Sequence, residues 1–351
     1  MKLVLVTQTL DPQHPALAQT IDLADALAAH VDELAVVARD VDWPVPANAS
    51  VRVFDAGSRV GRVAAFERAV LAATRGADGV LVHMVPQFAL LAAPIARVRR
   101  VPLLLWYTHW HASRALRLAT RVVDAALSVD ASSYPVPTRK LHALGHAIDV
   151  ERFDALPVTR HDGPLRLLAL GRTARWKGLA TLLDALELTS ADVRLEVRGP
   201  SLTPDEEAHR RELDARADGD RIRILPPVPR AEIPALLAGA DAVVSPNEPR
   251  AGSTLDKAVF EAAACRRPVV STNSAFASLL GGLPIELLAP PRDPRAVADR
   301  LDALAASPYE DRVAVGEALR RRVVESHSLE HWAAAVCRVV TEVRSARGTA
   351  G

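Results

Sequence analysis

The sequence predicts an α/β protein made of two Rossmann-like halves, each with a parallel sheet flanked by helices. Short apolar runs alternate with longer amphipathic runs along the chain, which is the pattern of consecutive βα units. The chain has 351 residues, more than one hydrophobic core usually supports, so two domains are expected. The alternation stops over residues 151–164, where Pro157, Gly163 and Pro164 indicate a linker.

The first half opens on an apolar run that ends at Thr7, and similar runs follow it. Strands are expected over residues 2–7, 33–38, 51–54, 79–83, 102–107 and 125–129. Amphipathic stretches between them predict helices over 16–29, 61–74, 88–98 and 113–121. In the first of these helices Leu17, Ile21, Ala24 and their neighbours keep one apolar face at helical spacing.

The second half repeats the scheme. Strands are expected over residues 165–170, 193–197, 221–225, 241–244, 268–271 and 285–287, and helices over 177–188, 204–217, 230–238, 255–265 and 294–306. Pro204 and Pro294 fall where a first helical turn tolerates proline. Two helices, 309–325 and 329–345, close the chain. We therefore expect domains over 1–155 and 156–325, with a final helical segment, 326–351, that packs back on the first domain.

Composition is that of a globular protein and argues against several partners. With 49% hydrophobic and 24% charged residues and a net charge of +1, no nucleic acid partner is predicted, and at most peripheral contact with a membrane. Aromatic residues make up 4%, which leaves little material for stacking bases. The two cysteines, Cys265 and Cys337, form neither a metal quartet nor a disulfide framework. The N-terminus lacks a signal-peptide core and no long apolar run follows, so a cytoplasmic protein is expected.

Two cations lie at the end of the strand expected over 165–170. The segment Gly-Arg-Thr-Ala-Arg-Trp-Lys-Gly runs from Gly171 to Gly178, and the next helix is expected to open with Lys177. Ligands of open α/β sheets bind at this carboxyl edge, and a diphosphate suits Arg172 as a planar fork and Lys177 as a point charge. Both could instead be surface charges. However, a lysine at a helix start interacts unfavourably with the helix macrodipole, and a bound anion would explain why a lysine occurs there.

The helix that carries Glu261 is preceded by a second segment of interest, residues 245–257. This segment reads Ser-Pro-Asn-Glu-Pro-Arg-Ala-Gly-Ser-Thr-Leu-Asp-Lys. Glu261 follows Phe260 and precedes three alanines, so its carboxylate needs partners, either ribose hydroxyls or solvent. Ser253 and Thr254 are expected to cap this helix, and a helix N-terminus also receives phosphate. Asp256 and Lys257 are expected in the first turn, where they contact either the sugar or solvent.

Several histidines end strands or follow them. His109 lies after the strand over 102–107, where it either packs in the structure or contacts a bound sugar, and His111 is a substitute for that role. His83 ends the strand over 79–83 and is a further candidate. These histidines lack metal-ligand spacing with carboxylates, so no metal site is predicted.

The ordered set of motifs resembles glycosyltransferase family 4. The set comprises Gly-Arg-x4-Lys-Gly from Gly171, the strand that ends at Gly199, Arg-Ile-Arg-Ile-Leu-Pro-Pro-Val from Arg221, Ala-Asp-Ala-Val-Val-Ser-Pro from Ala240, and Glu-Ala-Ala-Ala-Cys-x-x-Pro-Val-Val-Ser-Thr from Glu261. Upstream, Gly-His-Ala-Ile-Asp from Gly145 with Phe153, and Trp-Tyr-Thr-His from Trp106, resemble further family elements. The resemblance covers about 320 residues. Each motif is weak alone, but the order and spacing together are specific.

The resemblance implies a GT-B fold, in which two Rossmann-like domains face a central cleft, and a retaining hexosyltransferase. Arg172 and Lys177 carry over as the pair that binds the donor diphosphate, Glu261 as the ribose ligand, and His109 as a cleft histidine. Base contacts in this fold come largely from backbone near Gly199 and near Pro227 and Val228. The nucleotide sugar (UDP- or GDP-linked) is a substrate, so no cofactor is implied. The acceptor is a glycan, a lipid-linked sugar or a small molecule. Because protein cations take over charge stabilisation, a metal-independent reaction is expected.

Two departures from the family pattern keep alternatives open. Ser253 stands where the family has the first glutamate of its Glu-x7-Glu element, and the loop after the first strand lacks the family's glycine pair. The first departure leaves room for a catalytically impaired nucleotide-sugar-binding protein. A dinucleotide-binding oxidoreductase is disfavoured, because no Gly-x-Gly-x-x-Gly follows the first strand.

Overall fold

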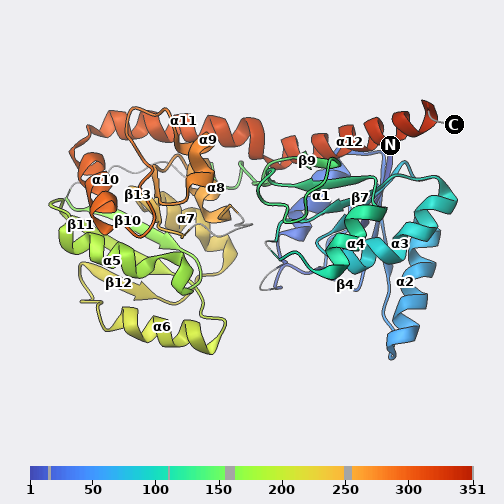
Figure 1. The fold of residues 1–351 in the computed structure, drawn as a ribbon, viewed down its shortest axis with the longest axis horizontal. Coiled ribbons are helices and arrows are strands. Elements are labelled where there is room, and N and C mark those ends of the chain that lie inside the picture. The colour runs from blue at the N-terminus through green and yellow to red at the C-terminus, as the bar shows by residue number, and fades with distance from the viewer. Residues whose placement is uncertain (15–16, 110, 155–162, 249–254, 350–351) are drawn as a thin grey trace. The chain divides into compact units, whose positions relative to one another are not determined.

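The computed structural model describes residues 1–14, 17–109, 111–154, 163–248 and 255–349. The chain divides into two compact units (Figure 1). The first comprises Met1–Ala147 and Ser328–Gly351, and the second comprises Ile148–Ala251 and Leu255–His327. The first unit therefore ends shortly before residue 155, where the sequence places the domain boundary.

A parallel sheet of seven strands, in the order β5-β3-β1-β6-β7-β8-β9, forms the centre of the first unit. Its strands are β1 (Lys2–Val6), β3 (Glu33–Ala38), β5 (Ala49–Val53), β6 (Gly79–His83), β7 (Leu103–Trp106), β8 (Ala125–Ser128) and β9 (Leu141–Ala143). Short strands β2 (Thr9–Leu10) and β4 (Asp40–Val41) pair separately. The central strands are buried along almost their whole length, as expected when helices cover both faces of a parallel sheet.

The helices of the first unit are α1 (Thr20–His30), α2 (Arg59–Ala73), α3 (Pro86–Arg99), α4 (Arg114–Val122) and α12 (Leu329–Thr349). Phe66 of α2, Ala89 of α3 and Leu116 of α4 share one buried cluster with Val4 of β1. Leu3 points to the opposite face of the sheet, because side chains alternate along a strand. On that face Val340 of α12 lies so close to β6 that a Cβ on Gly79 would be 2.8 Å from its Cγ1.

The second unit has a five-stranded parallel sheet in the order β12-β11-β10-β13-β14. Its strands are β10 (Leu165–Leu170), β11 (Val193–Arg198), β12 (Ile222–Leu225), β13 (Ala242–Ser245) and β14 (Val269–Ser271). Its helices are η1 (Arg175–Lys177), α5 (Leu179–Leu188), α6 (Pro204–Asp214), η2 (Arg230–Glu232), α7 (Ile233–Ala238), α8 (Lys257–Ala264), η3 (Ser274–Phe276), α9 (Ala277–Leu280), α10 (Pro294–Ala306) and α11 (Tyr309–His327). Helix α10 packs on α5, and α11 packs on α8.

Three sequence-based expectations for the second unit are wrong. The strand expected over 285–287 is absent, and an isolated bridge between Ser271 and Leu288 lies there instead. Lys177 does not open a long helix: it ends the 3-10 turn η1, and Gly178, with φ of +67°, separates it from α5. Helix α8 begins at Lys257 with Asp256 at the N-cap position, so the predicted start at residue 255 is also wrong, and the predicted caps Ser253 and Thr254 lie outside the described residues.

The seven-stranded and the five-stranded sheet each have one point where the strand order reverses. In the second unit this switch point lies between β10 and β13, and in the first unit it lies between β1 and β6. Ligands of open α/β sheets bind beyond the carboxyl ends of the strands at such points. The residues that follow these four strands are therefore the first to consider as a functional site.

Candidate nucleotide-binding site

A glycine-lined turn follows β10 at the switch point of the second unit. A Cβ on Gly178 would lie 1.9 Å from the carbonyl oxygen of Pro246, which follows β13, and a Cβ on Gly199 would lie 1.8 Å from the carbonyl oxygen of Gly171. The loops after β10, β11 and β13 therefore approach one another to a distance that side chains would prevent. These contacts leave backbone groups of three strand ends close together.

The ammonium group of Lys177 lies inside this turn. A Cβ on Gly171, the residue before Arg172, would be 3.2 Å from Lys177 Nζ. The structure thus brings the two predicted cations to one strand end. Lys177 is 8% exposed, and its ammonium lies 4.7 Å from the ring centroid of Trp176, a cation–π distance. A cation in this position is held for interaction with an anion rather than left in solvent.

Asp256 is the charge partner of Lys177. Lys177 Nζ donates to Asp256 Oδ2 at 2.6 Å, and Asn247 Nδ2 donates to the same oxygen at 2.9 Å. Burial by itself raises the pKa of Asp256, but the charge and hydrogen bond of Lys177, together with the bond from Asn247, outweigh it and hold the pKa below its usual value. Asp256, expected to contact the sugar or solvent, contacts Lys177 in this structure.

Arg172 is paired as well. Its guanidinium forms an ion pair with Glu206 of α6, and Nε donates to Glu206 Oε2 at 3.3 Å. The side chain of Glu206 is 6% exposed and that of Arg172 is 41% exposed. Glu206 also accepts from the backbone N–H of Leu202 at 2.7 Å. The carboxylate therefore holds one side of the guanidinium and leaves the other side accessible.

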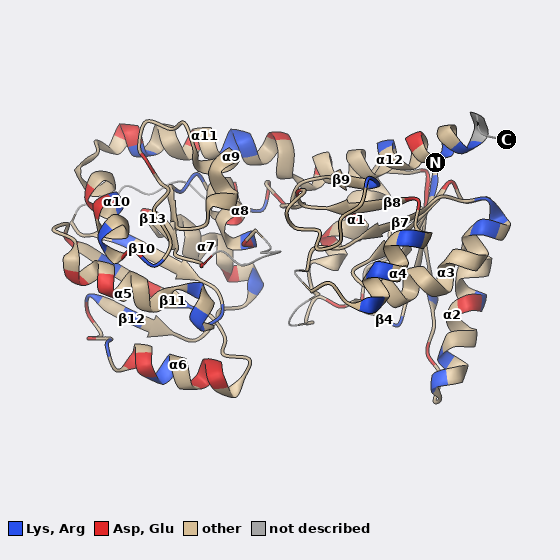
Figure 2. Ribbon diagram, viewed as in Figure 1, with Lys and Arg blue, Asp and Glu red and all other residues tan. Residues whose placement is uncertain are grey.

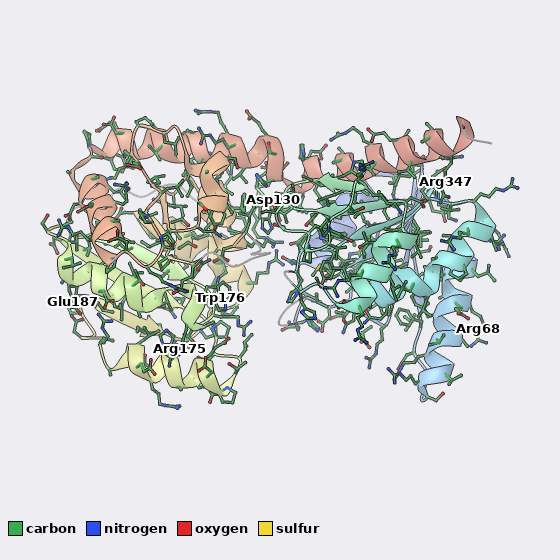
Figure 3. The ribbon with its side chains drawn as sticks, viewed as in Figure 1. Arg68, Asp130, Arg175, Trp176, Glu187 and Arg347 are labelled. Carbon is green, nitrogen blue, oxygen red and sulfur yellow. The ribbon has the colours of Figure 1, made fainter. Side chains whose placement is uncertain are left out.

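Helix α6 anchors the turn a second time. Arg175 in η1, labelled in Figure 3, donates to both oxygens of Glu212, at 2.9 and 2.7 Å. The hydrogen bonds from Arg175 and His209 lower the pKa of Glu212 to about 2. Glu248, after β13, donates its backbone N–H to the carbonyl of Trp176 at 2.8 Å. The turn is thus fixed from two sides before any ligand binds.

Glu261 lies in α8, one turn after Lys257. The two side chains form an ion pair at 3.7 Å and are 15% and 24% exposed. A half-buried carboxylate with a lysine partner can accept hydrogen bonds from hydroxyl groups, as the ribose assignment requires. Ser253 and Thr254, predicted to contact the diphosphate, lie outside the described residues.

The backbone predicted to contact the base lies on the neighbouring strand ends. Gly199 follows β11, and Pro227 and Val228 follow β12. Arg198 Nη1 donates to the carbonyl of Pro226 at 3.3 Å, which ties these two loops together. The predicted base region thus continues the edge that starts at Arg172.

His83 lies at the switch point of the first unit. It ends β6, is 3% exposed, and its Nδ1 lies 3.2 Å from the hydroxyl of Thr7, which follows β1. Burial lowers the pKa of His83 to about 4, so the imidazole is neutral at pH 7. A buried neutral imidazole is typical of a packed, hydrogen-bonded histidine.

His109 and His111 follow β7 and are both exposed. His109 Nδ1 accepts from the backbone N–H of His111 at 3.1 Å, and the carbonyl of His111 accepts from the hydroxyl of Tyr107 at 2.9 Å. Partial burial, with the charge of His111, lowers the pKa of His109. The bond from His111 occupies Nδ1 as an acceptor, so the neutral ring carries its proton on Nε2.

Sequence reasoning missed two members of this site. Glu206 lies 34 residues after Arg172, and Asn247 had no assigned role, because neither residue type nor spacing indicates such pairings. Within the described ranges, no three His, Cys, Asp or Glu side chains gather as a group that could hold a metal.

Two parallel-sheet units, each with a switch point that carries polar residues, define a protein of the GT-B fold class. Residues 164–307 match the family described as "Glycosyl transferases group 1". The predicted fold is therefore confirmed, and the family match agrees with the resemblance seen in the second half of the sequence.

Comparisons with individual proteins agree. D-inositol 3-phosphate glycosyltransferase of Xylanimonas cellulosilytica is 33% identical over 197 residues, which are 53% of this chain and 42% of that protein. The match thus spans less than half the length of that relative. A glycosyltransferase from Rickettsia africae superimposes with a TM-score of 0.77 at 13% identity, over 97% of this chain and 98% of the other. HepE of Anabaena, solved with UDP and glucose, gives a TM-score of 0.73 at 17% identity, over 97% and 99%.

Proposed function

We propose that this protein is a retaining glycosyltransferase that moves a hexose from a nucleotide-diphosphate sugar to an acceptor hydroxyl. The observation that carries the proposal is the buried cation Lys177, held beside Arg172 at the switch point of the second sheet. The family match over residues 164–307 supports the reaction class. Complexes of HepE with UDP and with UDP-glucose support a uridine donor among the UDP- and GDP-linked sugars.

The reaction breaks the bond between the anomeric carbon and the diphosphate oxygen and forms a bond from that carbon to the acceptor oxygen on the same face. The acceptor proton passes to the departing phosphate. Negative charge builds on the leaving diphosphate, and Lys177 and the free side of Arg172 stabilise it electrostatically. Because these cations supply that stabilisation, the proposed reaction runs without a divalent metal.

The remaining roles are part of the same proposal. Glu261 binds the ribose hydroxyls, and backbone near Gly199, Pro227 and Val228 contacts the base. Ser253 and Thr254 contact the diphosphate. His109 of the first unit contacts the transferred sugar through Nε2, with His111 fixing its ring. The acceptor is a glycan, a lipid-linked sugar or a small molecule.

A transfer and donor-hydrolysis assay with UDP-glucose and GDP-linked sugars tests the proposal. Lys177→Ala should lower turnover by roughly 100-fold or more, because one electrostatic stabiliser is lost. Arg211→Ala, at an exposed arginine of α6, is the control and should be normal. Activity should survive excess EDTA. Turnover that chelation abolishes and Mg²⁺ restores would overturn the metal-free mechanism.

His109→Ala should lower kcat more than donor affinity, because the side chain is assigned to the sugar and not to the nucleotide. Normal turnover with reduced thermal stability would show that His109 only packs.

The second candidate function is nucleotide-sugar binding without transfer. It is favoured by Ser253, which stands at the position of the family's first glutamate. Tight donor binding by calorimetry, with neither transfer nor slow hydrolysis of the donor, would support it.

A further inference from the structure

One surface of the first unit carries a charge imbalance that the net charge of the whole chain conceals. Helices α2 and α4, and α3 with its C-terminal Arg100, carry nine arginines and one carboxylate, Glu67. The nine are Arg59, Arg62, Arg68, Arg97, Arg99, Arg100, Arg114, Arg117 and Arg121. The three helices cover one face of the sheet, and their basic residues are blue in Figure 2. We call their outer surface the α2–α4 face.

These arginines are accessible and not neutralised by neighbours. Eight are exposed and Arg62 is half-buried, and Figure 3 shows Arg68 on the side of α2 away from the sheet. Among the described residues, none of the nine forms an ion pair with a carboxylate. On α12, by contrast, Arg344 and Arg347 pair with Asp78 and Asp124.

Helix stability does not account for the arrangement. Arg97 and Arg99 lie in the last turn of α3, where a cation complements the helix dipole. Arg59 and Arg62, however, lie in the first turn of α2, and Arg114 and Arg117 lie in the first turn of α4. Neither turn contains an acidic residue. Cations at these positions oppose the dipole, so another interaction must favour them.

Aliphatic side chains are interleaved with the arginines. Val60 of α2 and Val98 of α3 are each 81% exposed, and Leu118 of α4 is 49% exposed. In α4, Leu118 lies between Arg114, Arg117 and Arg121 at the spacing of one helical stripe, while Leu116 and Ala119 are buried. The large hydrophobic residues exposed on these helices are aliphatic and not aromatic.

We propose that the α2–α4 face docks on an anionic lipid surface. Arginines at this density are attracted to acidic headgroups, and the aliphatic side chains between them enter the interface. A single-stranded nucleic acid would favour exposed aromatic side chains for stacking. No helix in the described part of the chain is long and apolar enough to cross a membrane, so the contact is peripheral. The inference does not depend on the proposed transfer reaction.

Vesicle co-sedimentation of the full chain tests the proposal. Binding should be strong to phosphatidylcholine vesicles with about one third phosphatidylglycerol, weak to pure phosphatidylcholine, and reduced by salt. Neutralising Arg114, Arg117 and Arg121 to Gln should lower the partition coefficient roughly fivefold per arginine, on the order of 100-fold in all. Leu118→Ser should weaken binding without changing its salt dependence.

The matched control neutralises three exposed arginines on other helices, Arg211→Gln, Arg321→Gln and Arg338→Gln, with the same change in net charge. It should bind vesicles like the wild type, and circular dichroism melting checks that both triple variants are folded. Equal loss in the two triple variants would overturn the proposal, as would equal binding to both vesicle types. Binding to duplex DNA or to an acidic polypeptide, with no binding to vesicles, would assign the face to a different partner.

Discussion

At the residue scale, the pairing of Lys177 with Asp256 determines how much positive charge the turn after β10 offers to a ligand. The two side chains are 10% and 15% exposed, so each is largely removed from water. A buried charge is costly without a partner, and Asp256 supplies one when no anion is bound. An ammonium group has three donors, so Lys177 can bind a phosphate oxygen and keep its bond to Asp256.

Removing one partner of this pair should cost more than removing both. Asp256→Ala leaves the Lys177 ammonium buried and unpaired and should destabilise the protein by about 3 kcal/mol. The double variant Asp256→Ala, Lys177→Ala lacks that orphan charge and should be more stable than Asp256→Ala alone. Chemical denaturation of the four proteins in the double-mutant cycle measures this coupling. Additive losses would show that solvent already screens the pair.

His83 predicts a pH dependence of stability. Its pKa is about 4 in the folded protein against an ordinary value of 6.5, so between these values the unfolded chain binds a proton that the folded chain does not. The contribution of His83 to the free energy of unfolding is therefore fully present above pH 6.5 and is lost as the pH falls towards 4. At pH 4.5 the loss should be roughly 2–3 kcal/mol.

His83→Gln keeps a partner for Thr7 but does not titrate, so it should lack this loss. Denaturation curves for both proteins at pH 7 and pH 4.5 test the prediction, with tryptophan emission from Trp43, Trp106 and Trp332 of the first unit as the signal. The quantity to compare is the difference between the two proteins, because other groups titrate in both. The same loss in both would show that His83 is not the cause.

At the element scale, the sequence was most informative for strands of five or six residues that are largely apolar. Strands β3, β6 and β10 have the predicted bounds, because buried parallel strands are continuous apolar runs. Strands β2 and β4 have two residues each and are too short to leave such a pattern, and the three residues of β9 include no buried one. The break between η1 and α5 was missed for a different reason. Gly178 adopts positive φ where Pro246 approaches it, a contact that depends on tertiary structure.

Gly178→Ala tests how far this close approach maintains the turn. The added Cβ would lie 1.9 Å from the carbonyl oxygen of Pro246, so the loop after β13 would have to move. Gly219→Ala is a matched control, because Gly219 also has positive φ, +79°, but has nothing within 4 Å of a Cβ.

In the control, Gly219→Ala, the free energy of unfolding should fall only by the cost of a left-handed residue, roughly 1–2 kcal/mol. Gly178→Ala should lose more than that in thermal stability and should also weaken nucleoside diphosphate binding by calorimetry. Equal effects of the two substitutions would show that the backbone conformation matters here and the contact does not.

At the scale of the whole molecule, the two units carry different kinds of charge. The second unit pairs its functional cations with carboxylates of its own, Glu206 and Asp256, and is prepared for a small anion. Among the residues that the structure describes, the nine arginines of the α2–α4 face have no carboxylate partners, which suits an extended anionic surface. Family motifs in the sequence locate the first arrangement. The overall composition does not reveal the second, because a net charge of +1 averages over both units.

This separation predicts that a nucleoside diphosphate alone protects one unit and not the other. At about 100-fold excess over its Kd, UDP should stabilise the unit that binds it by roughly 2.7 kcal/mol. Hydrogen exchange measured by mass spectrometry should then slow in peptides from β10 to α5 and from α8. Peptides from α2, α3 and α4 should exchange as before. The Lys177→Ala protein with the same UDP is the control and should show little protection anywhere. Protection of equal size in both units would place part of the nucleotide site in the first unit, and the assignment of the diphosphate to the turn after β10 would then have to be revised.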